Sequence, residues 1–166
     1  MKYLNILFLL LVFAACEYDS FEDEIALSGL PDTDIPAFIR FDNGLDPVIT
    51  LAEADGSTSV RLDFQFPVES DLTVDFSFGG DAVFGEDFTV ANSSASGGSL
   101  TIEHDPENIA FTTGDLEVMT VIDTTADGTK ELIITLTNAT AADGTPVNVG
   151  QGDLHKTATF SIVDEG

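Results

Sequence analysis

Carboxylates dominate the side chains of this chain that are capable of chemistry. Among its 166 residues are 30 Asp and Glu, against five Lys and Arg and two His. The histidines, His104 and His155, do not share a metal-ligand spacing such as His-Glu-x-x-His. The single cysteine, Cys16, has no second cysteine with which to form an internal disulfide. The chemistry to expect is therefore electrostatic, and clustered carboxylates favour divalent metal ions.

Catalytic patterns are missing from the sequence. A Gly/Ser-rich stretch at residues 93–99 lacks the nucleophile elbow of a serine hydrolase, and no glycine loop or basic groove for phosphates is evident. The formal net charge of −25 repels the phosphate backbone of nucleic acids. We expect a protein that is not an enzyme and has no nucleic-acid partner.

The N-terminus has the pattern of a secretory signal. An apolar run at residues 6–15 ends in Ala14 and Ala15 and is too short for a membrane span. With Cys16 directly after these alanines, it resembles a bacterial lipoprotein signal, in which the cysteine is lipidated and becomes the new N-terminus. Phe13 departs from the leucine usual at that position. The alternative is an ordinary cleaved signal peptide followed by an incidental cysteine.

The residues after the cysteine are acidic. Five of the eight residues at 17–24 are Asp or Glu, which resembles the surface-export signal of Bacteroidota lipoproteins; the alternative is a merely solvated tether. We expect a lipid anchor in the cell outer membrane, facing outward, because attached acyl chains bind membranes stably. The expected organisation is a signal peptide at 1–15, an acidic tether at 16–36 that starts from lipidated Cys16, and one domain at 37–166.

The domain has a two-residue hydrophobic period almost throughout, which predicts strands with one buried face. Asp-Gly, Gly-Gly and Asn-Gly turns separate these strands. Many short strands without a helical stripe indicate an all-β fold, an antiparallel β-sandwich, with phenylalanine as the dominant core aromatic. The expected strands span residues 37–41, 48–53, 60–66, 72–78, 99–103, 108–111, 116–122, 131–137 and 157–162.

Strand and turn motifs follow one another in a definite order over residues 48–166. They are LAEADG at 51–56, TVDF at 73–76, GEDF at 85–88, TTGD at 112–115, VID at 121–123, TLTN at 135–138 and SIVDE at 161–165. Together they resemble the Calx-beta family, whose domains are immunoglobulin-like β-sandwiches. Residues 91–107 depart from the family pattern as an inserted hairpin or lengthened loop. In a second alignment, residues 99–102 form the family's strand and the insertion follows them.

The resemblance implies a calcium site at one end of the sandwich, since carboxylates from several loops supply the oxygen ligands that calcium prefers. Here Thr124 and Thr125 replace two of the family's acids, and Lys130 adds a repelling charge. The alternative is that these acids are solvated and cap turns. The implied ligands are Glu53, Asp81, Asp123, Glu131, Asp164 and Glu165.

The expected function is that of a non-catalytic cell-surface lipoprotein with a Calx-beta-like binding or adhesion module, stabilised by calcium. Its partners would be the membrane, through the lipid anchor, and a protein or glycan that the sequence does not identify. The alternative is an accessory glycan-binding or nutrient-binding lipoprotein of an outer-membrane uptake system.

Overall fold

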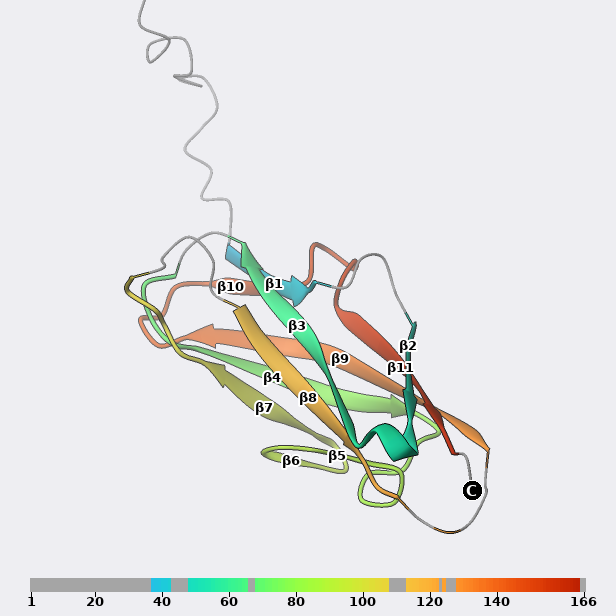
Figure 1. The fold of residues 1–166 in the computed structure, drawn as a ribbon. Helices are drawn as coiled ribbons and strands as arrows, with labels where there is room; N and C mark the ends of the chain where they lie inside the picture. The colour runs from blue at the N-terminus through green and yellow to red at the C-terminus, as the bar shows by residue number, and fades with distance from the viewer. Residues whose placement is uncertain are drawn as a thin grey trace, which may run out of the picture. The chain divides into compact units, whose positions relative to one another are not determined.

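The domain is a sandwich of two β-sheets (Figure 1). The structure, a computed structural model, describes residues 37–42, 48–65, 68–107, 113–122, 124 and 128–164. Sheet A has five strands in the order β10-β1-β3-β8-β5, and sheet B has six in the order β2-β11-β9-β4-β7-β6. Within these residues no helix is long and apolar enough to cross a membrane.

The strands are numbered in the order in which they follow one another along the chain. Those of sheet A are β1 (Ala37–Phe41), β3 (Ser57–Gln65), β5 (Phe88–Val90), β8 (Thr113–Thr120) and β10 (Val147–Val149). Those of sheet B are β2 (Val48–Ala52), β4 (Leu72–Gly80), β6 (Ser93–Ser94), β7 (Gly97–Ile102), β9 (Thr129–Ala141) and β11 (Thr157–Val163). A three-residue 3₁₀ turn, η1 (Glu53–Asp55), joins β2 to β3.

Most pairs are antiparallel, but the first two strands each pair in parallel. β1 lies beside β10 in sheet A, and β2 lies beside β11 in sheet B. The N-terminal part of the domain therefore contributes one strand to each sheet, which holds the two sheets together along one side.

Alternation of side chains explains why these segments are strands. In β4, Leu72, Val74 and Phe76 are buried, whereas the residues between them are exposed or half-buried. In β11 the buried residues are Ala158, Phe160 and Ile162. The inward residues of the two sheets form one hydrophobic core, as expected where each sheet buries one face against the other.

Strand β9 changes its alternation part of the way along. Its inward residues include Leu136 and then Ala139, with Thr137 and Asn138 both exposed between them. The pairing with β4 shifts at the same point: Asp75 lies opposite Asn138, and the next residue of β4 lies opposite Leu136. This β-bulge inserts one residue and thereby returns the apolar side chains to the core.

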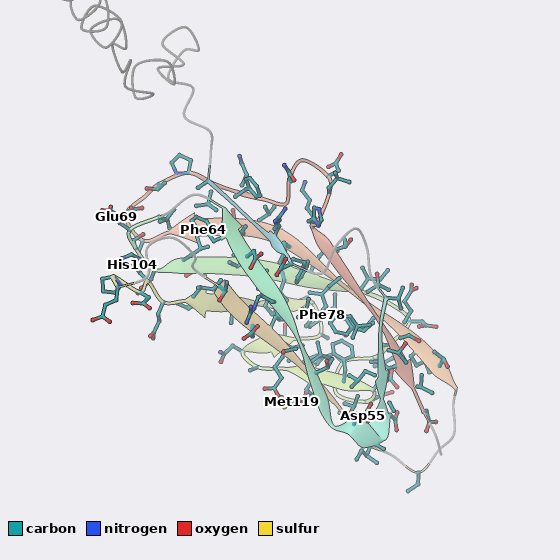
Figure 2. All side chains as sticks on the ribbon, turned by 45° about the horizontal axis from the view of Figure 1, so that its top comes forward. Asp55, Phe64, Glu69, Phe78, His104 and Met119 are labelled. Carbon is teal, nitrogen blue, oxygen red and sulfur yellow. The ribbon has the colours of Figure 1, made fainter. Side chains whose placement is uncertain are left out.

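A group of four phenylalanines fills one end of the core. The ring centroids of Phe78 and Phe88 lie 5.0 Å apart at an interplanar angle of 86°, and those of Phe84 and Phe88 lie 5.7 Å apart at 85°. Phe76 also packs against Phe78, at 5.6 Å. Edge-to-face contacts of this kind are favourable beyond the area that they bury. The prediction of a phenylalanine-rich interior is confirmed here (Phe78 is labelled in Figure 2).

The predicted all-β sandwich is confirmed, with small corrections to its elements. Glu53 does not extend β2 but begins η1, and β8 ends at Thr120 rather than at residue 122. The predicted strand at 108–111 lies outside the described residues. Residues 91–107 contain a hairpin of β6 and β7, and β7 pairs along β4 from Leu72 to Phe76.

Candidate functional site

One end of the sandwich gathers the predicted ligands that the structure describes. We call this end the rim and define it as residues 52–56, 80–87, 120–122, 128–131 and 163–164. Strand pairing places these segments together: Val163, at the end of β11, lies opposite both Ala52 and Thr129. Gly80, at the end of β4, lies opposite Leu132. Figure 2 shows Asp55 of the rim at one end of the domain, with Glu69 and His104 at the other.

Glu53 is the predicted ligand with the most unusual environment. It is 7% exposed, and it is one of two buried charged residues among those described. Its backbone carbonyl accepts a hydrogen bond from the Thr120 hydroxyl at 2.8 Å and one from the Gly56 N–H at 3.3 Å. Because Thr120 belongs to sheet A and Glu53 follows a strand of sheet B, these contacts tie the two sheets together at the rim.

Asp81 and Glu131 lie side by side where β4 ends and β9 begins. The Asp81 carboxylate accepts a hydrogen bond from the Glu131 N–H at 2.6 Å, and the Glu131 carbonyl accepts from the N–H groups of Asp81 and Ala82 at 2.9 and 3.0 Å. Asp81 therefore fixes the backbone at the end of β4 against the beginning of β9. Its contact also places the exposed Glu131 side chain at the rim.

The remaining predicted ligands belong to two segments at the same end. Asp164 is half-buried and directly follows β11. Asp123 and Glu165 lie outside the described residues, although each directly follows a described rim residue in the sequence. Cys16 also lies outside the described residues.

Two rim carboxylates that the sequence did not single out as ligands have structural roles. The Asp87 side chain, 7% exposed, accepts a hydrogen bond from the Val83 N–H at 2.5 Å and so closes the turn before β5. The Asp55 side chain accepts from the Ala52 N–H at 3.1 Å across η1. The GEDF motif at 85–88 contained the signal for Asp87, because Asp is a common turn residue whose side chain hydrogen-bonds nearby backbone groups.

The rim has the donor chemistry of a calcium site, but its described part does not complete one. Hard carboxylate and carbonyl oxygens are the ligands that calcium takes. Within the described residues, however, no three Asp, Glu, His or Cys side chains lie close enough together to hold a metal ion. Asp81 already uses one oxygen on the backbone of Glu131. Any such site therefore needs oxygen ligands besides the described carboxylates, from backbone carbonyls, water or the segments outside the described residues.

Two sheets with this strand order and a loop-rich acidic end define an immunoglobulin-like β-sandwich. Comparison with solved structures narrows the class to the Calx-beta fold. The apo form of the Calx CBD1 domain superposes with a TM-score of 0.56 at 18% identity, covering 78% of this chain and 98% of that domain. Calx CBD2 gives 0.52 at 12% identity, covering 77% and 86%.

A longer Calx structure is also similar. The calcium binding domain CBD12 of CALX1.1 gives a TM-score of 0.54 at 20% identity, covering 78% of this chain and 44% of that one. No protein-family model and no curated protein sequence matches the chain. The resemblance predicted from the motifs is thus confirmed at the level of fold.

Proposed function

We propose that this chain is the non-catalytic binding module of a cell-surface lipoprotein, and that its rim binds calcium. One observation supports the proposal most directly. Four of the six ligands predicted from sequence, drawn from widely separated motifs, lie at the same end of the sandwich, and one of them, Glu53, is buried there. Neighbours with this fold include a structure described as a calcium binding domain.

Charge explains what a bound cation would do. Carboxylates at the rim ends of β2, β4 and β11 add to the charge repulsion within a chain whose formal net charge is −25. A divalent cation would offset that repulsion and rigidify the loops that carry the acids. Because no three described carboxylates lie close enough together to share an ion, no more than two of Glu53, Glu131 and Asp164 would contribute oxygens from the described part of the rim. Asp123 and Glu165 would contribute from the segments next to it.

The surface location remains part of the proposal and rests on the sequence. The apolar run before Cys16 and the acids at 17–24 support a lipidated, outward-facing chain. The strongly acidic composition supports a protein or glycan partner over a nucleic acid. We propose binding or adhesion, with the rim loops held in shape by calcium.

Calcium titration tests this function. We expect saturable heat in calorimetry and a rise in the melting temperature, because a ligand that binds only the folded state stabilises it by about 2.7 kcal/mol at 100 times its Kd. Glu53→Gln and Glu131→Gln should each weaken binding at least about tenfold, since each removes a charged oxygen ligand. Glu69→Gln, an exposed acid at the opposite end (Figure 2), is the matched control and should bind as the unchanged chain does.

Absence of heat together with an unchanged melting temperature at millimolar calcium would overturn the calcium proposal. Equal weakening by Glu69→Gln would show diffuse screening of charge instead of a site. Glu131 is exposed, so Glu131→Gln remains informative even if replacing the buried Glu53 unfolds the domain.

A further inference from the structure

The strands that end the two sheets differ in how well they are protected. Strands β5 and β10, at the ends of sheet A, have three residues each, and β6, at one end of sheet B, has two. Strand β2, at the other end of sheet B, has five (Figure 1). Proteins commonly protect a sheet edge with a very short strand, a charge or a proline. The sequence of β2, VITLA, has no charge and no proline, so β2 is an unprotected edge.

The backbone of β2 directs hydrogen-bonding groups away from sheet B. The N–H of Leu136 donates to the carbonyl of Lys156 at 2.9 Å, so even-numbered residues of β11 face β9 and odd-numbered residues face β2. In the parallel register of β2 with β11, the odd-numbered residues of β2 then bond to β11, and the even-numbered residues face the open edge. The N–H of Ala52 accordingly donates to the Asp55 carboxylate at 3.1 Å instead of to β11.

Both backbone groups and apolar surface are uncovered at this edge. Val48 and Thr50 direct their N–H and C=O outward there, where no described strand pairs with them. Val48, on the outer face of the sheet, is 61% exposed, and Ile49, on the inner face, is half-buried against the core. A strand added beside β2 would pair with the backbone groups and cover both side chains.

We propose that β2 pairs in antiparallel orientation with β2 of a second copy of this chain, about a two-fold axis at Thr50. The two six-stranded sheets then join into one. At the axis, the N–H and C=O of Thr50 bond to those of Thr50 in the second copy. On the inner face, Ile49 lies opposite Leu51 of the second copy, in the kind of pair where antiparallel side chains approach most closely. Such a contact is self-complementary and closes after two copies.

Charge favours this orientation over parallel pairing. Glu53 directly follows β2 and Asp55 lies two residues further, so parallel pairing would set the acidic rims of the two copies side by side. In antiparallel pairing about Thr50, the two copies of Glu53 lie at opposite ends of β2, about 20 Å apart at about 3.4 Å per residue. That separation exceeds the Debye length of about 8 Å at physiological ionic strength, so salt screens their repulsion.

Charge also disfavours the other occupants of the edge. A strand without charged side chains offers no ion pair to a basic segment of another protein. The chain's own stretch at 17–24 has five acids, which the acids at the rim would repel. Since each copy has a formal net charge of −25, an uncharged edge lets two copies approach with the least repulsion.

Sedimentation equilibrium tests the association. The whole chain, in density-matched detergent with a reductant, should show a monomer–dimer equilibrium that tightens as salt is added. Thr50→Pro removes the N–H at the axis from both copies and leaves the β11 side paired, which edge strands tolerate. It should raise the dimer Kd at least about tenfold, whereas Thr50→Ala keeps that N–H and should raise it less. A chain that stays monomeric at millimolar concentration, or equal Kd values for the two variants, would overturn the proposal.

Charge complementation keeps the test decisive if proline disturbs the fold. Thr50→Lys and Thr50→Glu should each be monomeric alone, because the axis sets like charges opposite each other, and their mixture should form a heterodimer. Thr73→Lys and Thr73→Glu are the matched controls, since Thr73 is exposed on the central strand β4, and each should dimerise as the unchanged chain does. A mixture of the Thr50 variants that stays monomeric would contradict the pairing.

A disulfide at the axis tests the antiparallel register. Bonded antiparallel residues have Cα atoms about 5.5 Å apart, within the range of about 4.4–6.8 Å that a disulfide spans. In a Cys16→Ser background, Thr50→Cys should form a covalent dimer on mild oxidation, whereas Thr73→Cys should not. Equal cross-linking of both variants would show random collision and count against the axis.

Hydrogen exchange identifies what covers the edge. The amides of Val48 and Thr50 should exchange quickly in the dilute chain and more slowly as its concentration rises, because only the dimer pairs them. Protection that is the same at every concentration would show that another part of the same chain covers β2, and the proposal would then be wrong.

Discussion

Acidic side chains at the rim are of two kinds, those that cap turns and one that is buried, and residue type alone does not distinguish them. Asp55, Asp81 and Asp87 each accept a backbone N–H and so close a turn or corner. Turn capping was the alternative to calcium binding for the predicted ligands; of these three residues only Asp81 is such a ligand, and its hydrogen bond to the backbone of Glu131 has that capping character. Glu53 differs because it is buried at the junction of the two sheets.

A second group of charges, on the outer face of sheet A, predicts a pH-dependent stability. Partial burial raises the pKa of Asp63 above its ordinary value of 3.8, and the neighbouring Asp42 carboxylate raises it further. Folding therefore favours protonated Asp63, and stability falls as pH rises from 3.8 through the raised pKa. Asp63→Asn should melt at a higher temperature than the unchanged chain at neutral pH. The difference should vanish near about pH 3, where Asp63 is protonated in both states.

Asp143→Asn is the matched control, because it changes the net charge equally. Hydrogen bonds from the Thr145 backbone and side chain lower the pKa of Asp143 below 3.8. Its charge thus contributes stability above that pH, which is lost as pH falls through the lowered pKa. We expect Asp143→Asn to melt lower than Asp63→Asn at neutral pH. Identical melting curves would mean that relief of general repulsion, and not the local environment, governs both.

At the scale of elements, the two-residue period was sufficient to predict the longer strands. β1 has the predicted bounds, and β3, β4, β9 and β11 contain or overlap the predicted segments. The short strands β5, β6 and β10 were missed, because two or three residues are too few to show a period. The bulge at Thr137 was missed as well, since it depends on pairing with β4 rather than on the sequence of β9 alone.

For the candidate site, the sequence predicted which end of the sandwich carries the acids but not the contacts that they make. The family resemblance implied that Glu53, Asp81, Glu131 and Asp164 lie at one end; strand pairing brings their segments to the same end, and their role as ligands stays a prediction. Nothing in the sequence indicated that the Asp81 carboxylate would accept a hydrogen bond from the Glu131 N–H. That bond joins two residues that only the pairing of β4 with β9 brings together.

Close packing between β7 and β8 makes a prediction for these elements. A Cβ atom at Gly114 would lie 2.7 Å from Ile102 Cγ1 and 2.8 Å from its Cδ1, and Ile102 is 4% exposed. Gly114→Ala should therefore destabilise the domain by about 1–3 kcal/mol in urea unfolding. In the Ile102→Val background the same substitution should cost less, since one of the two contacting atoms is gone. An equal cost in both backgrounds would contradict the packing described.

At the scale of the whole molecule, the proposal joins a compact sandwich to an acylated N-terminus. Cys16→Ser should abolish labelling with radioactive fatty acid and release the chain from the membrane fraction, because no thiol remains for the diacylglycerol. Substituting Asn or Gln for the five acids at 17–24 should leave labelling intact and reduce cleavage of the chain by protease added to whole cells. Labelling that persists in Cys16→Ser would refute lipidation at this residue.

The central claim is that calcium binds at the rim, and hydrogen exchange with and without calcium measures this by position. With millimolar calcium, we predict slower exchange at the rim amides of residues 53–56, 81–87 and 128–131, and no change around Glu69 and His104 at the opposite end. Unchanged exchange at the rim, or protection confined to the opposite end, would contradict the account.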